Sequence, residues 1–214
     1  MRVEPVTAEV LVRRVVDLVL DRADRTARDQ AVRLAVDGHP STRPEDLADA
    51  LVEPLRAAGH PVARIRADDF LRPRSLRLEH GHHDPDALLD DRLDVSALNR
   101  EVLSAVGPGG TGRYLPSLRD PVTDRATRAA PVPAEPGLVV VLDGCLVLGR
   151  WLDLDLAVHL ALRPATLRRR TGPDQEWTLP AYERYAEETD PEGIADLVVR
   201  VDDPRHPALV HREG

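Results

Sequence analysis

The sequence predicts a three-layer α/β domain with a mainly parallel sheet of five strands. Short apolar segments rich in β-branched residues alternate with amphipathic helical segments along the chain, and this alternation is typical of parallel sheets whose strands are connected by helices. With 214 residues, 42% of them hydrophobic and 31% charged, the chain can bury one sizeable core and is too apolar to be generally disordered. We therefore expect a single domain over residues 1–214.

A helix and a buried strand are expected first. Apolar residues at three- and four-residue spacing predict a helix over residues 7–26, with Thr7 as its N-cap. Residues 31–36 are apolar and partly β-branched, which predicts a buried strand that enters a loop at Asp37-Gly38.

A second helix and a second strand follow. Pro44 and the two acidic residues after it favour a helix N-terminus, and Gly59 ends this helix. Residues 62–66 predict the second strand, which leads into the acidic pair Asp68-Asp69.

The second half of the chain supplies the remaining strands. A short helix is expected at 95–105 and irregular, proline-rich surface chain at 116–137. Three further strands are predicted at residues 138–142, 154–162 and 195–201.

The composition excludes several classes of function. The net charge is −8 and only 3% of the residues are aromatic, so neither a basic surface nor a row of stacking rings for nucleic acid is expected. All 29 basic residues are arginine, so the chain offers no lysine ammonium group. No apolar run is long enough to cross a membrane and no signal-peptide pattern is present, so we expect a cytoplasmic protein that binds neither membranes nor nucleic acid.

Acidic residues follow three of the predicted strands, namely Asp37, Asp68 and Asp143. The carboxyl ends of parallel strands meet at one edge of a sheet, so these carboxylates are expected to converge there. Such a cluster can hold Mg²⁺ or accept a proton from a hydroxyl group. The alternative is that strand-end aspartates only cap loops or helices.

The motifs of the chain, in their order and spacing, resemble those of the uridine kinase family of P-loop kinases. In chain order they are VDGHP, ADDFLRPR, PGGTGRY, VLDG, LRRR and ADLVV. The resemblance runs from about Val32 to Pro207. It implies a P-loop kinase-like three-layer fold and the ATP-dependent phosphorylation of a nucleoside or a similar small hydroxyl compound.

The resemblance also implies roles for individual residues. Asp68 corresponds to the general base and to the acid on the Mg²⁺ side, and Asp143 lies at the Walker-B-like strand end, where it is a second expected metal ligand. Arg168 and Arg169 lie near the lid arginines that steady the transferred phosphoryl group. The lid region, residues 163–190, is shorter than that of the family.

The implied substrate pocket comes from three separate segments. His83 stands where the family carries a ribose-binding aspartate, which puts a nucleoside ligand specifically in doubt. The expected substrate-binding residues are Asp69, Phe70, Arg72, His83, Asp86, Arg113 and Tyr114.

The P-loop is where the sequence departs from the family. The pattern G-x-x-x-x-G-K-[ST] cradles phosphates with backbone amides, a lysine and a hydroxyl group. Here Arg43, Pro44 and Glu45 replace the second glycine, the lysine and the hydroxyl residue. Proline removes amide donors, and the glutamate brings negative charge. The residues left for a degenerate nucleotide site are Gly38, Ser41, Thr42 and Arg43.

Two smaller features are ambiguous in the sequence. His80, His82, His83 and Asp84 lie within five residues, and we interpret them as a solvated polar loop, with substrate contact and a transition-metal site as alternatives. Cys145 is the single cysteine, which we expect to be a small core residue rather than a nucleophile.

These observations lead to three hypotheses. The first is a small-ligand-binding pseudokinase, or a repurposed enzyme, with a degraded ATP-binding loop. The second is an active kinase for a small molecule in which arginines replace the P-loop lysine. Mg²⁺ and ATP are cofactors only under the second. The third is an interaction module, with a homodimer as one possibility.

Overall fold

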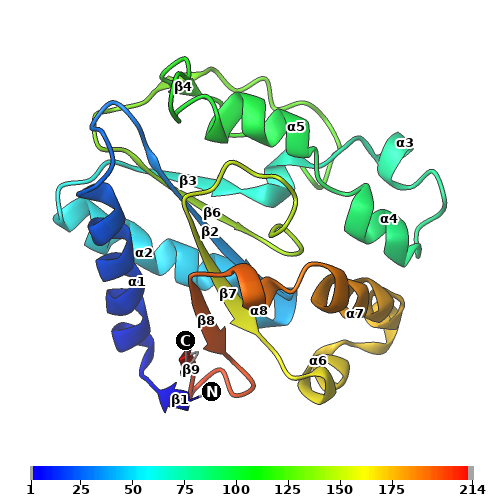
Figure 1. Ribbon diagram of the computed structural model, residues 1–214. Coiled ribbons are helices and arrows are strands. Elements are labelled where there is room, and N and C mark those ends of the chain that lie inside the picture. Colours follow the sequence, from blue (N-terminus) through cyan, green and yellow to red (C-terminus); the bar gives the residue numbers. More distant parts are fainter. Residues whose placement is uncertain (1, 212–214) are drawn as a thin grey trace.

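The computed structural model describes residues 2–211, and its centre is a seven-stranded sheet with the order β1-β9-β8-β7-β2-β6-β3 (Figure 1). The strands are β1 Arg2–Pro5, β2 Val32–Gly38, β3 Val62–Arg66, β6 Val139–Gly144, β7 Leu156–Ala161, β8 Leu197–Arg200 and β9 Ala208–His211. A separate short hairpin pairs β4 (Arg113–Tyr114) with β5 (Val132–Pro133).

The parallel part of the sheet contains the five predicted strands, in the order β8-β7-β2-β6-β3. The prediction of a mainly parallel α/β sheet is therefore confirmed, but its strand count was wrong. Strands β9 and β1 extend one edge in antiparallel orientation. Each has only four residues. β1 is largely exposed, and β9 has a buried run of three residues, which is shorter than the buried runs in the central strands β2 and β6.

Helices cover both faces of the sheet (Figure 1). One face carries α1 (Ala8–Ala23) and α2 (Pro44–Ala57), and Thr7 caps α1 as predicted, accepting from Val10 N at 3.2 Å. The other elements are α3 Arg74–Arg77, α4 Pro85–Asp90, α5 Val95–Leu98, α6 Pro164–Arg170, α7 Leu179–Glu188 and α8 Pro191–Ile194, the 3₁₀ turns η1 Pro40–Thr42, η2 Ala67–Phe70 and η4 Pro173–Thr178, and the π turn η3 Asn99–Leu103. No helix within residues 2–211 is long and apolar enough to span a membrane.

Alternation along β2 decides which side chains reach each face of the sheet. Val32, Leu34 and Val36 pack into the apolar layer under α1 and α2. Ala35 packs into the layer on the opposite face. Because side chains alternate along a strand, Asp37 points to the same face as Ala35. The end of β2 therefore presents a carboxylate to the side covered by α7 and α8.

The topology creates a crevice at the carboxyl ends of the central strands. The chain leaves β2 toward β3 on one side, and it leaves β7 toward β8 on the other. In open parallel sheets, ligands bind where neighbouring connections diverge in this way. The loop after β2, the end of β6 and the segment after α6 all lie at this edge.

Candidate functional site

The loop between β2 and α2 has closed on itself. Thr42 N donates to His39 O at 2.7 Å, and Arg43 N donates to Pro40 O at 3.1 Å. Ser41 N donates to His39 Nδ1 at 3.1 Å. Prolines at two other positions of the loop carry no amide hydrogen. Three amides of the loop, those of Ser41, Thr42 and Arg43, are therefore satisfied within the loop, and two further positions have no amide hydrogen.

Gly38 and Arg43 show the same closure. A Cβ atom at Gly38 would lie 2.5 Å from Thr42 Oγ1 and 2.9 Å from Leu160 Cβ, so this glycine permits close packing of the loop. Arg43 occupies the left-handed region with φ of 55°. Its side chain is 67% exposed and pairs with Asp46 at 2.8 Å. The four predicted nucleotide-side residues thus lie in one loop, but Arg43 is held by an acid of α2.

The His39 side chain contacts both its own loop and helix α7. Its ring packs edge-on against Tyr182, with the centroids 4.6 Å apart, and Nδ1 lies 2.8 Å from Ser41 Oγ. Burial, assisted by the nearby Arg170 guanidinium, lowers the pKa of His39 to about 4. The imidazole is therefore neutral near pH 7, and it accepts the Ser41 amide hydrogen at Nδ1.

The two predicted metal ligands are both held by arginines. Asp143, buried at the end of β6, pairs with Arg64 of β3 at 2.5 Å. Burial raises the pKa of Asp143, although this arginine opposes the shift. Asp68 pairs with Arg92 at 2.7 Å. Within the part of the chain that the structure describes, no group of three or more candidate ligands gathers around a metal position.

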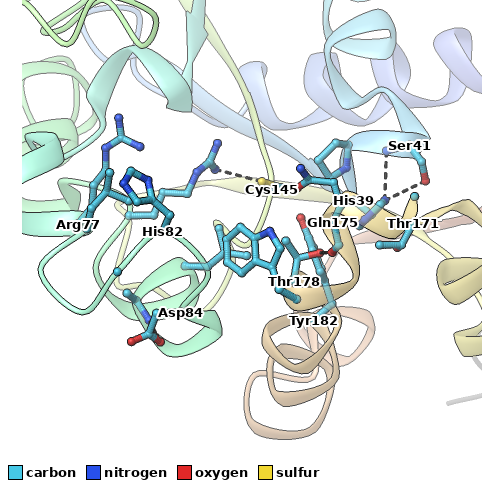
Figure 2. A pocket seen from close by; sticks show the side chains of 18 of the residues that line it. His39, Ser41, Arg77, His82, Asp84, Cys145, Thr171, Gln175, Thr178 and Tyr182 are labelled. Carbon is cyan, nitrogen blue, oxygen red and sulfur yellow. Dashed lines mark hydrogen bonds between the residues drawn. The ribbon is translucent and has the colours of Figure 1, made fainter.

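The main cavity at this edge, cavity 1, has a volume of about 520 Å³. It lies between η1, the segment from α3 to α4, and the segment from Arg170 through η4 to α7. Figure 2 shows its two walls, with Arg77, His82 and Asp84 on one side and His39, Ser41 and Thr171 on the other. Cys145 lies between these walls.

Three arginines make cavity 1 cationic, namely Arg77, Arg92 and Arg170. Burial lowers the pKa of Arg77, which lies 3.7 Å from Asp124, but an arginine remains charged at neutral pH. Among the described residues that line the cavity, the one carboxylate is Asp84. Its Oδ1 caps α4 by accepting from the amides of the first turn. The lining therefore carries an excess of positive charge.

Arg170 is the least satisfied of these arginines. Its Nη2 donates to Asp202 O at 2.8 Å, which anchors the side chain at the end of α6. Its Nη1 is buried and has no hydrogen-bond partner among residues 2–211. A buried donor without a partner is unfavourable, so Arg170 is held with part of its hydrogen-bonding capacity unused.

Arg92 connects the acidic strand end to the cavity wall. It donates to Asp68 at 2.7 Å and, through Nη1, to Cys145 Sγ at 3.1 Å (Figure 2). The Cys145 sulfur and the Asp68 carboxylate raise the pKa of Arg92 further above the usual value, against the effect of burial. Burial raises the pKa of Cys145, so the thiol is protonated at neutral pH. Cys145 packs against the core, as expected, and it also lines the cavity.

The substrate-binding residues expected after the second strand do not line cavity 1. Phe70 is fully buried in the core and offers no surface to a ligand. Arg72 pairs with Asp91. Asp69 lies half-buried near Asp68 and Asp143, and burial raises the pKa of its carboxyl group.

The other expected substrate residues do not line cavity 1 either. His83 packs against Trp177 with ring centroids 5.4 Å apart, whereas its neighbours His82 and Asp84 line the cavity. Asp86 is 78% exposed and pairs with Arg184 of α7. The two remaining residues belong to the β4–β5 hairpin, namely Arg113 and Tyr114.

The lid arginines are distributed differently from the prediction. Arg168 pairs with Glu183 at 2.5 Å on the surface, and Arg169 is exposed. Arg170, which the sequence suggested only as part of the basic run 168–170, is the member of this run that lines cavity 1. Successive helical residues point about 100° apart, so helical periodicity could have separated the three. No sequence signal marked Arg77 or Arg92.

Solved structures of three kinases resemble this chain. A possible uridine kinase from Bacillus stearothermophilus is 20% identical, with a TM-score of 0.66 over 87% of this chain and 98% of that one. A putative fructose transport system kinase from a Silicibacter species is 22% identical, with a TM-score of 0.55 over 83% and 90%. A D-glycerate 3-kinase from Cryptococcus neoformans is 14% identical, with a TM-score of 0.53 over 84% and 80%.

These similarities establish the fold, and the chain has the P-loop kinase-like architecture that its motifs predicted. No protein-family model and no curated protein sequence matches the chain. At identities of 22% or less, the shared architecture does not carry a ligand or a reaction with it.

Mg²⁺ and ATP, which the fold implies, do not fit the residues at the expected position. The amides of η1 are used within the loop, and Glu45 places a carboxylate at the start of α2. The carboxylates expected to hold Mg²⁺, Asp68 and Asp143, are each paired with an arginine.

Proposed function

We propose that this protein is a uridine-kinase-like pseudokinase that binds a small anionic ligand in cavity 1. The observation that carries this proposal is the contrast between the closed loop after β2 and the open, arginine-lined cavity beside it. The loop has lost the features that a triphosphate needs. The neighbouring cavity keeps the volume and the charge that suit a small ligand.

The lining of cavity 1 favours a ligand with an oxyanion and an apolar body. Arginine N–H groups match the geometry of phosphate and carboxylate oxygens, and Arg77, Arg92 and Arg170 line the cavity. The remaining wall includes apolar and aromatic side chains, namely Leu78, Ala87, Leu88, Trp177 and Tyr182. A volume of about 520 Å³ is typical of sites for small metabolites. A phosphorylated metabolite of this size fits the chemistry.

The test is calorimetric titration of the full chain, with inorganic phosphate as the simplest probe and phosphorylated metabolites as candidate ligands. Replacing Arg170 with glutamine removes the charge and the buried Nη1 donor, so we expect affinity to fall roughly tenfold. Arg169→Gln is the matched control, because it makes the same change on the exposed neighbour. Equal affinities for wild type and both variants, or no binding of any anion, would overturn the proposal.

A second candidate function is an active kinase whose arginines replace the P-loop lysine. The position of Arg170 beside His39 favours it, since this places a cation next to the loop after β2. Here Asp68 would accept the proton of the acceptor hydroxyl. Transfer of labelled phosphate from ATP to a hydroxyl compound, abolished by Asp68→Asn, would establish this function and contradict the pseudokinase proposal.

A further inference from the structure

One wall of cavity 1 is a short exposed segment, residues 78–84, which connects α3 to α4. Four of its residues line the cavity, namely Leu78, Gly81, His82 and Asp84. Residues 79–83 are all exposed. A Cβ atom at Gly81 would meet nothing within 4 Å, and its φ of 110° is one that residues with side chains rarely adopt. The turn of this segment therefore stands in open space beside the cavity.

The hydrogen bonds of residues 78–84 are local. Leu78 N donates to Arg74 O and Gly81 N donates to Leu78 O, both at 3.0 Å. Asp84 accepts from two amides in the first turn of α4. Within residues 2–211, no hydrogen bond or ion pair joins this segment to residues outside 74–88. Segments with so few long-range contacts open locally at a low free energy.

Both ends of the segment are anchored to the body of the protein. At the α3 end, Arg74 N donates to Asp124 Oδ2 at 3.0 Å. At the α4 end, Arg184 of α7 pairs with Asp86 at 2.9 Å and with Asp90 at 2.7 Å. The inward face of α4 is also buried. Residues 78–84 can therefore move while the helices on either side stay in place.

A contact between two rings joins the segment to η4. His83 packs against Trp177, with the ring centroids 5.4 Å apart and the ring planes inclined by 37°. Trp177 lines cavity 1, whereas His83 does not. η4 continues directly into α7, where the buried Tyr185 donates its hydroxyl hydrogen to Asp37 at 3.1 Å. The ring contact thus links a loosely held segment to a fixed one at the edge of cavity 1.

We propose that residues 78–84 form a flap that opens and closes over cavity 1, with the His83–Trp177 contact as its latch. When the rings separate, the flap moves outward and uncovers the interior of the cavity, where Cys145 lies between the walls (Figure 2). When the rings pack, the flap shields that interior. That the opening admits a ligand rests on the function proposed for cavity 1, whereas the opening itself does not.

Cys145 reports the opening without any ligand, because it is the single cysteine and lines cavity 1. The experiment measures the rate at which a maleimide labels it in the full chain at neutral pH. His83→Ala removes the latch. The loss of such a ring pair shifts an equilibrium roughly two- to tenfold, so labelling should accelerate by that factor. His80→Ala is the matched control and should label as the wild type does, because His80 is exposed on the same flap and joins no ring contact within residues 2–211.

Two further measurements separate the latch from other effects. His83→Phe keeps a ring against Trp177 and should label as slowly as the wild type. Hydrogen exchange at the Gly81 amide should be faster in His83→Ala, whereas the amides of the buried strand β2 should be unchanged, since the opening is local.

Inorganic phosphate distinguishes this proposal from the function proposed for cavity 1. If phosphate does not slow labelling of the wild type but His83→Ala accelerates it, the flap is supported and the anion site fails. Equal labelling rates for wild type and His83→Ala, equal acceleration in His80→Ala, or labelling of His83→Phe as fast as that of His83→Ala would overturn the flap.

Discussion

Two cavities lie at the carboxyl edge of the sheet, namely cavity 1 and a second cavity beside it of about 490 Å³, cavity 2. Three arginines and one carboxylate line cavity 1, whereas the described lining of cavity 2 contains three carboxylates and no arginine. Ion pairs reduce this contrast, because Arg92 pairs with Asp68 at 2.7 Å and Glu192 with Arg200 at 3.0 Å.

His39 and Tyr182 line both cavities and stand between them. His39 belongs to the loop after β2, whose amides bond within the loop, so this loop forms part of the partition between the cavities.

The largest expected effect on stability comes from removing the buried carboxylate of Asp37, which lines cavity 2. Val147 N and the Tyr185 hydroxyl donate to this carboxylate, and His159 Nδ1 lies 2.7 Å from it. Asp37→Ala leaves three donors without their acceptor in a fully buried place, which should cost about 3–5 kcal/mol of unfolding free energy. Urea denaturation measures this loss. Asp17→Ala, an aspartate exposed on α1, is the control and should stay within about 0.5 kcal/mol of wild type. A loss at Asp37 as small as that of the control would show that the buried network does not hold the cavity.

A smaller effect on stability is expected from the protonation of His39, which lies between the two cavities. The pKa of His39 is lowered from 6.5 to about 4 in the folded protein, so the unfolded chain binds the proton more readily. The contribution of His39 to stability is therefore fully present above pH 6.5 and is lost as the pH falls toward 4. After allowance for partial solvent exposure, we expect a loss of about 1–2 kcal/mol.

The control for this pH dependence is His39→Asn, which keeps a side-chain acceptor for the Ser41 amide and does not titrate. Urea denaturation at several pH values should show a flatter dependence for the variant than for the wild type over the window from 6.5 to 4. If the unfolding free energies of the two proteins change equally with pH, folding does not lower the pKa of His39, and the prediction is wrong.

The smallest effect on stability is expected at Arg43, which lines neither cavity 1 nor cavity 2. Its ion pairs with Glu45 and Asp46 are exposed, and exposed pairs contribute about 0–1 kcal/mol. Arg43→Ala should therefore change stability by less than about 1 kcal/mol and leave the binding of phosphate to cavity 1 unchanged. If this variant no longer binds phosphate, the anion binds at the loop after β2 and not in cavity 1.

The fold was largely predictable because the five parallel strands carry short apolar segments. Segments such as Val139–Gly144 are buried along their whole length, so hydrophobicity alone marks them. The antiparallel strands β1 and β9 were not predicted. Each has four residues, and β1 is a largely exposed edge strand. The departure from the P-loop pattern was also readable, because the missing glycine, lysine and hydroxyl residue have specific chemical roles.

The site was less predictable because it depends on contacts between distant segments. Arg92 reaches cavity 1 through its pairing with Asp68, 24 residues away, and Asp37 meets His159 across 122 residues. No local pattern encodes such distances. The family resemblance selected the run 167–170 but could not say which of its arginines faces inward. The possible homodimer and the cytoplasmic location stay predictions.

The central claim, that the loop after β2 no longer cradles a polyphosphate, is tested most directly by titrating Mg-ATP into the wild-type protein by calorimetry. The account predicts no binding at the loop, and therefore no difference between the wild type and Arg43→Ala. Micromolar binding of Mg-ATP that Arg43→Ala abolishes would contradict it.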